Sequence, residues 1–216
     1  MKKKRNIIVS VLMTIISLVY VYLVKNFDVS AIGPKNSKVG FSTINSIFIK
    51  HVGRHMEIYK LTEVLGYVIL LLVLLYGLVG FIELIKRKSI FKIDREIICV
   101  GILYVMMISV YVFFEKFIIN YRPVLIDGVL EASFPSSHTM LSLCTIISSL
   151  IISKKYIKDN KFYNVTVFIS MLLLTLVFVG RTISGVHYLS DIVGGVLISI
   201  TLLSYFYTIL RWKKQD

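Results

Sequence analysis

Two histidines, two arginines and an aspartate stand in three short polar stretches of a chain that is otherwise strongly apolar. The stretches run from Glu115 to Pro123, from Ser133 to Thr139 and from Gly180 to Asp191. They hold, in order, Lys116 and Arg122; Ser136, Ser137 and His138; and Arg181, His187 and Asp191. Arginine grips phosphate oxygens through a planar fork, and a pair of histidines can serve as nucleophile and general acid. These residue types therefore indicate phosphoryl transfer from an anionic substrate.

Two local patterns support this interpretation. Pro135-Ser136-Ser137 stands directly before an apolar run, as at a helix start, where free N–H groups and the positive end of the helix dipole bind anions. His187 and Asp191 are four residues apart, so on a helical turn the carboxylate would hold the tautomer of the imidazole. Such a constellation predicts phosphate binding and transfer without a metal ion or another cofactor.

Each feature also has a plain structural interpretation. Arg122 or Arg181 alone is equally well explained as an arginine that anchors the end of a membrane span. A Pro-Ser-Ser sequence usually only caps a helix, Asp191 can cap one as well, and a single histidine is more often a hydrogen-bonded structural residue. None of these explanations predicts that all three stretches lie on one side of the protein.

The composition is that of a helical membrane protein. Hydrophobic residues make up 56% of the 216 residues and charged residues 17%, and the mean hydropathy is +0.81. A helix needs about 20 apolar residues to cross the hydrocarbon core, and runs of about 18 or more are candidates. Six such runs lack Asp, Glu, Lys and Arg: Asn6–Val24, Val64–Ile82, Ile97–Phe114, Ala132–Ser153, Phe162–Gly180 and Ile192–Leu210. The sequence predicts an all-α fold, a bundle of six transmembrane helices that forms one domain over residues 1–216.

The distribution of basic residues predicts the orientation of this bundle. With six spans and the N-terminus inside, 16 of the 25 lysines and arginines fall on the inner side. They are Lys2–Arg5, the five between Lys86 and Arg95, the four between Lys154 and Lys161, and Arg211, Lys213 and Lys214. By the positive-inside rule both termini are cytoplasmic, and the three polar stretches then share the outer side. The net charge of +13 anchors the protein to anionic lipids, and no basic–aromatic pattern of a nucleic-acid groove is present.

The first outer loop, Lys25–Glu63, is predicted to contain an amphipathic helix in the membrane interface. Its apolar residues recur at steps of three and four, at Phe41, Ile44, Phe48, Val52 and Met56. On such a helix His51 and His55 would share one turn, as a pair of metal ligands does. A zinc site needs at least one more good ligand, and the sequence marks none, so two polar positions on an interfacial helix are the favoured interpretation.

The three polar stretches together resemble the signature of the type 2 phosphatidic acid phosphatase superfamily of integral-membrane lipid phosphatases. That signature is a lysine, six residues and Arg-Pro; then Pro-Ser-Gly-His; then Ser-Arg, five residues, His, three residues and Asp. Here the parts are Arg122-Pro123; Pro135-Ser136-Ser137-His138; and Arg181, His187 and Asp191 at the full spacing. Ser137 takes the glycine position and Gly180 the serine position. The close resemblance extends over residues 115–195.

The resemblance implies a role for each matching residue. His187 attacks phosphorus to form a phosphohistidine, and Asp191 orients it. His138 protonates the leaving oxygen and then helps to activate water. The phosphoryl oxygens are bound by Arg122, Arg181 and the backbone of Ser136 and Ser137.

The lysine position of the signature is the one clear departure. Glu115 occupies it, and Lys116 follows one residue later, which on a helix is a rotation of about 100°. We expect the flexible stem of Lys116 to absorb part of that rotation, so that Lys116 faces the phosphate.

The resemblance further implies a multi-pass enzyme of the cell membrane whose site opens outward near the lipid head groups. Its substrate is expected to be a lipid phosphate, with undecaprenyl or another polyprenyl diphosphate first. Phosphatidylglycerophosphate or phosphatidic acid is the alternative, because the signature reads the phosphate and not the lipid tail. A protein that binds or transports anionic lipids without turnover is the alternative from another class. The sequence leaves the oligomeric state open.

Overall fold

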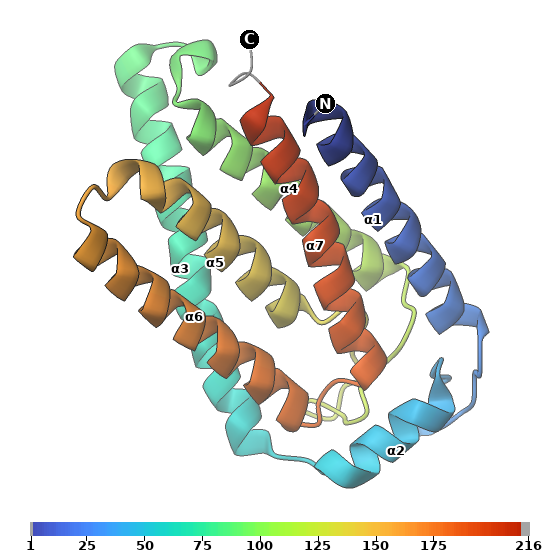
Figure 1. Cartoon of the computed structure of the whole chain (residues 1–216). Coiled ribbons are helices and arrows are strands. Elements are labelled where there is room, and N and C mark those ends of the chain that lie inside the picture. Colours follow the sequence, from blue (N-terminus) through green and yellow to red (C-terminus); the bar gives the residue numbers. More distant parts are fainter. Residues whose placement is uncertain (1, 213–216) are drawn as a thin grey trace.

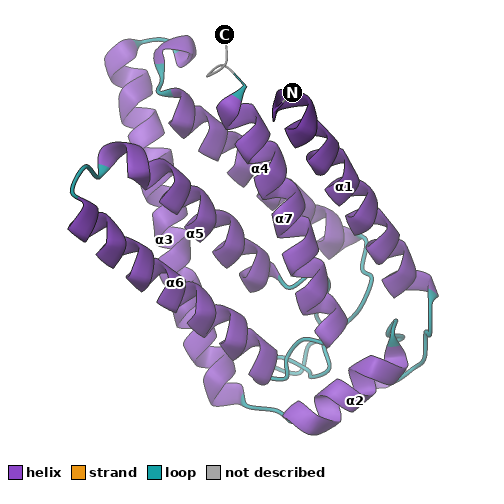
Figure 2. Ribbon diagram, viewed as in Figure 1, coloured by secondary structure: helices purple, strands orange, loops and turns teal. Residues whose placement is uncertain are grey.

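The computed structural model describes residues 2–212, and in that range the chain is helical with no β-strand (Figure 1). Loops of different lengths join the helices, as Figure 2 shows. The α-helices are α1 (Lys2–Asn26), α2 (Ser42–Val52), α3 (Met56–Arg87), α4 (Arg95–Lys116), α5 (Ser137–Tyr156), α6 (Asn160–Ile183) and α7 (Leu189–Arg211). Two short 3₁₀ turns, at Pro34–Asn36 and Ile90–Lys92, lie in the loops. The all-α prediction is confirmed.

Five of these helices are long and apolar enough to cross a membrane, namely α1, α3, α4, α6 and α7. The fourth predicted span, Ala132–Ser153, corresponds to α5, which is not among the five. Helix α5 begins only at Ser137, because the residues before it belong to a loop. It is also rich in serine and threonine, which lowers its hydropathy.

Helix α5 is the inner helix of the bundle, packed against α3, α4, α6 and α7. Its hydroxyl groups are largely buried, and several bond to its own backbone. Ser142 Oγ donates to the carbonyl of Thr139 at 3.1 Å, and Ser148 Oγ donates to that of Thr145 at 3.2 Å. A helix surrounded by protein can therefore be more polar than one that faces lipid.

The long helices run alternately up and down, so that loops 117–136 and 184–188 meet at one end of the bundle (Figure 1). The start of α1 and the end of α7 lie at the opposite end, where the ammonium group of Lys3 stands 3.8 Å from the ring centre of Trp212. The described basic residues assigned to the inner side lie at this end too; Lys213 and Lys214 fall outside the described residues. The three polar stretches thus share one end of the molecule.

Helix α1 packs chiefly against α7, the last helix of the chain. Two pairs of buried hydroxyls join them: Ser10 with Thr208 at 3.2 Å, and Ser17 with Thr201 at 2.9 Å. Hydroxyl pairs of this kind hold transmembrane helices together where lipid offers no hydrogen-bond partner.

The first outer loop differs in detail from its prediction. Helix α2 lies across the end of the bundle that carries the polar stretches (Figure 1), but it stops at Gly53, whose φ of 76° breaks the helix. His51 therefore lies in the last turn of α2, while His55 directly precedes α3. Among the described residues, each ring is hydrogen-bonded to a nearby carbonyl, that of Ile47 and that of Val52 respectively. The idea that the two share a helical turn is wrong. Glu63, taken as the end of this loop, instead lies inside α3.

Candidate active site

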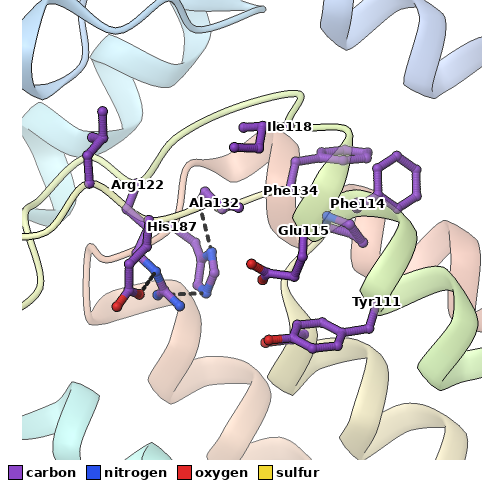
Figure 3. A pocket seen from close by; sticks show the side chains of 13 residues that line it. Tyr111, Phe114, Glu115, Ile118, Arg122, Ala132, Phe134 and His187 are labelled. Carbon is purple, nitrogen blue, oxygen red and sulfur yellow. Dashed lines mark hydrogen bonds and ion pairs between the residues drawn. The ribbon is translucent and has the colours of Figure 1, made fainter.

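A cavity of about 430 Å³ opens at the end of the bundle where the polar stretches meet (Figure 3). Helix α4, the 117–136 loop, the start of α5 and His187 form its walls. Of the predicted site residues, Arg122, Ser137 and His187 line it directly. Tyr111, Glu115 and Glu131 add further polar groups, and the oxygens of Tyr111 and Glu115 point across the cavity toward His187 (Figure 3).

His187 lies in the loop between α6 and α7 and is 1% exposed. Its Nε2 stands 3.3 Å from Arg122 Nη1, and because a guanidinium only donates hydrogen bonds, Nε2 is the acceptor. Its Nδ1 lies 3.0 Å from the hydroxyl of Ser133, which itself donates to Asp191 Oδ2 at 2.6 Å. This assigns the proton to Nδ1 and leaves Nε2 unprotonated, with its lone pair directed at Arg122. His187 therefore has the tautomer of a nucleophile that attacks through Nε2.

The electrostatic surroundings keep His187 neutral. Burial lowers its pKa well below the ordinary value of 6.5, and the positive charges of Arg122, Arg181 and His138 lower it further. The imidazole consequently carries its lone pair throughout the neutral pH range.

Asp191 acts on His187 through Ser133 and not by the direct contact that the sequence spacing predicts. His187 precedes α7, whose cap is Tyr188, so the two residues do not share a helical turn. The Asp191 carboxylate accepts hydrogen bonds from Ser133, from Asn120 Nδ2 at 2.8 Å and from the backbone N–H of Tyr188 at 3.0 Å. Ser133 is thus a functional residue that the sequence interpretation missed.

The two arginines both face carboxylates. Arg122 Nε lies 3.0 Å from Glu131 Oε2, in an ion pair without the direction of a hydrogen bond. Arg181 is 0% exposed, and its Nη2 donates to Glu63 Oε1. Its Nε and Nη1 have no hydrogen-bond partner among the described residues. Buried N–H groups of a cation without partners are costly, so this arginine is poised to bind an anion.

The start of α5 offers backbone N–H groups, but not all of those predicted. Ser136 N–H is already used, because it donates to the carbonyl of Asp191 at 3.0 Å. No side chain caps the helix among residues 2–212, so the N–H groups of Ser137, His138 and Thr139 remain for an anion. The N–H of Met140 already donates to the carbonyl of Ser136. The hydroxyl of Ser136 accepts from Thr139 at 3.0 Å and supports the turn instead.

His138 is the second residue of α5 and lies against α3. Its Nε2 stands 3.6 Å from Glu63 Oε1, and its Nδ1 is buried without a partner among the described residues. His138 also lines a second cavity, of about 300 Å³, between α3, α4 and α5. That cavity is almost wholly apolar and shares Tyr111 and Ser137 with the first.

Lys116 does not line the cavity. It is the exposed last residue of α4, and Glu115 takes the place beside the site. The expected turn of Lys116 toward the phosphate is therefore absent from this structure, and the departure from the family signature is real.

A buried amide network behind Asp191 was also missed from the sequence. Asn120 Oδ1 accepts from the N–H of Gly40 at 3.0 Å, which ties the first outer loop to the site. Asn45 of α2 donates to Ser190 Oγ at 2.8 Å and accepts from Ser190 N–H at 3.2 Å. Only the fold shows that these loop and helix positions are buried.

Comparison with known proteins identifies the family and a similar fold. The sequence model of the PAP2 superfamily matches residues 101–215, more than half of the chain. A crystal structure described as the first transmembrane PAP2 type phosphatidylglycerolphosphate phosphatase, from Bacillus subtilis, is similar with a TM-score of 0.62. The two chains are 18% identical, and the match covers 96% of this chain and 97% of the other. The search of curated proteins gives no match. From the family match and the shared fold, this chain belongs to the PAP2 superfamily, whose members are phosphatases acting on lipid phosphates.

Proposed function

We propose that the chain hydrolyses a membrane lipid phosphate through a phosphohistidine on His187, without a metal ion. The observation that carries this proposal is a neutral, buried His187 whose unprotonated Nε2 contacts Arg122. A phosphoryl group placed against Nε2 would meet this guanidinium and the N–H groups at the start of α5. Arg181 does not line the cavity, and its two unpaired nitrogens are proposed to reach the phosphoryl oxygens from behind the cavity wall. These are the groups that stabilise charge on the equatorial oxygens during phosphoryl transfer.

The proposed reaction has two steps. His187 Nε2 attacks phosphorus, the bond to the lipid oxygen breaks, and protonated His138 gives its proton to that oxygen. Asp191 stabilises the resulting charged imidazole through Ser133. In the second step water attacks phosphorus and passes a proton to His138, the P–N bond breaks, and inorganic phosphate leaves.

A lipid is the proposed substrate because polar and apolar cavities adjoin. The first cavity holds the phosphate-binding groups, and the second presents side chains such as Leu70, Met107 and Leu141. A lipid whose phosphate lies in the first cavity would have its apolar tail beside the second cavity and the surrounding membrane lipid.

Within this class we place phosphatidylglycerophosphate first and polyprenyl diphosphate second. Glu115 and Glu131 line the first cavity beside Arg122. A carboxylate accepts a hydrogen bond from a hydroxyl and repels extra negative charge. Phosphatidylglycerophosphate carries a hydroxyl next to the phosphate that is removed, whereas a diphosphate carries a second anionic group there. The similar crystal structure is described as a phosphatase of the former lipid.

The proposal includes the membrane arrangement. Helix α5 is taken as the sixth span, shielded by its neighbours, and α2 as a helix in the outer interface. Both termini are taken as cytoplasmic and the site as outside, because most of the described basic residues lie at the opposite end of the bundle.

The direct test is phosphate release by the purified protein in lipid vesicles. Phosphatidylglycerophosphate, phosphatidic acid and a polyprenyl diphosphate are compared, with His187→Ala as the inactive control. Turnover should persist in EDTA and be inhibited by vanadate, which mimics the five-coordinate phosphoryl group. Binding of these lipids without turnover would support a lipid-binding or transport protein and overturn the proposal. Glu115→Gln and Glu131→Gln should raise the relative rate on the diphosphate; an unchanged ratio would reject the ranking of substrates.

A further inference from the structure

Glu63 on α3 links two residues of the proposed mechanism. One oxygen, Oε1, accepts from Arg181 Nη2 and lies 3.6 Å from His138 Nε2. Arg181 belongs to α6 and His138 to α5, so this single atom joins three helices. Neither the family signature nor the matched sequence region includes Glu63.

The surface of α3 is shaped to hold His138. Gly66 follows Glu63 by three residues, so both lie on one helical face. A Cβ at Gly66 would stand 2.5 Å from the His138 ring, closer than any real contact. The absence of a side chain at this position therefore lets the ring lie against α3, within reach of Glu63.

A carboxylate beside an imidazole stabilises its protonated form. Burial opposes this effect at His138 most strongly. The positive charges of Arg181 on α6 and Arg122 in the 117–136 loop oppose it as well, and His187 of the 184–188 loop is also nearby. Glu63 on α3 supplies the negative charge that counters them. With Nε2 beside Glu63, the buried Nδ1 of His138 remains available to a leaving oxygen.

We propose that Glu63 is a positioning residue that favours the protonated form of His138 as the general acid and orients Arg181 for the phosphoryl group. The proposal rests on the function proposed above. Glu63 pairs with only Nη2 of Arg181, so Nε and Nη1 stay available for phosphate oxygens.

The test compares Glu63→Gln with wild type on two phosphate monoesters, one with an alkyl and one with an aryl leaving group. The glutamine oxygen can still accept from Arg181, but its neutral amide no longer stabilises protonated His138. An alkoxide needs a proton to leave, whereas an activated aryl oxide does not. We expect kcat/KM to fall about 10- to 100-fold for the alkyl ester and about threefold or less for the aryl ester. The alkaline limb of the pH profile should move to lower pH by about one unit.

Two further variants complete the experiment. Glu57→Gln changes an exposed carboxylate on the same helix and should leave both substrates and the pH profile unchanged. Glu63→Asp keeps the charge, so its alkaline limb should stay near that of wild type, and it serves alone if the glutamine variant does not fold. Folding is checked by thermal unfolding in detergent.

The outcomes separate this inference from the function on which it rests. Equal losses on the two esters with an unmoved pH profile would leave Glu63 as a partner of Arg181 only and overturn the proposed role at His138. A Glu63→Asp profile shifted as far as that of Glu63→Gln would do the same, because charge would then not be the cause. If wild type releases phosphate from neither ester nor from the lipids, the proposed function itself fails.

Discussion

The Ser133 hydroxyl donates a hydrogen bond to Asp191 and accepts one from Nδ1–H of His187. It therefore links the carboxylate to the proposed nucleophile. This indirect link has a physical benefit. The carboxylate stays fully hydrogen-bonded in a buried place, where an unpaired charge is costly, and still fixes the tautomer of the imidazole.

Ser133→Ala should therefore damage catalysis more than folding. The loss of a hydrogen bond to a charged group corresponds to about 1.5–3 kcal/mol, or roughly a 10- to 100-fold lower kcat/KM. Asp191 keeps its bonds from Asn120 and Tyr188, so the protein should remain folded. Ser142→Ala is the matched control, because that buried hydroxyl bonds only to its own helix. Equal activity of the two variants would show that Ser133 does not transmit the effect of Asp191.

The lowered pKa of His187 predicts its charge state directly. A group whose pKa lies well below 6.5 is neutral at pH 7 and stays neutral as the pH falls through the ordinary range. Histidine-selective ¹⁵N NMR should show His187 as the Nδ1–H tautomer even about one unit below that value. A His187 signal that shows protonation at the ordinary value of 6.5 would contradict the proposed electrostatic environment.

At the residue scale, the sequence identifies those positions at which the proposed chemistry requires one particular side chain. Arg122, His138 and His187 are recognisable because phosphoryl chemistry requires their functional groups at the family spacing. Ser133 and Glu63 are not, because serine and glutamate are common and their roles depend on contacts between distant segments.

At the scale of elements, α2 is a support for the site. Through Asn45 it holds Ser190, the neighbour of Asp191, and the loop before it contacts Asn120 through Gly40. The predicted helix was correct in kind but extended too far, because the three-and-four pattern of apolar residues continues past the break at Gly53. Hydropathy likewise located the apolar centre of α3 but not its first eight residues, which lie at its polar end.

Asn45→Ala should loosen this support. The residue is fully buried, and its removal leaves the N–H of Ser190 and the carbonyl of Gly40 without their partner. Each buried unsatisfied group costs about 1–3 kcal/mol, so we expect a clearly lower thermal midpoint in detergent together with reduced activity. Ser46→Ala, at an exposed position of the same helix, is the control. A variant of Asn45 as stable as that control would show that α2 does not brace the site.

At the scale of the whole molecule, alternation of the long helices places all the polar stretches at one end. That result follows from the number of apolar runs, which is why the sequence predicts it. The inner position of α5 was not predictable in the same way, because hydropathy does not distinguish a helix surrounded by protein from a marginal span.

The orientation of the bundle predicts which loops are reachable from outside the cell. In a background without Cys99 and Cys144, cysteine is introduced at Val129 in the 117–136 loop, which is 58% exposed, or at exposed Asn160 at the start of α6. An impermeant thiol reagent should label intact cells at Val129 and label Asn160 only after the membrane is opened. The reverse pattern would place the site in the cytoplasm.

The pairing of α1 with α7 has a consequence for biosynthesis. Among the described helices α1 is synthesised first, yet the hydroxyls that match Ser10 and Ser17 lie on α7, which is synthesised after the other six. Until α7 has entered the bilayer, those serines can bond only within their own helix or to lipid and water. Helix α7 begins two residues after His187 and carries Asp191, so its arrival completes the hydrogen-bond network of the candidate site at one end while it docks α1 along its length. Insertion of α7 therefore assembles the candidate site and holds α1 in the bundle in a single step.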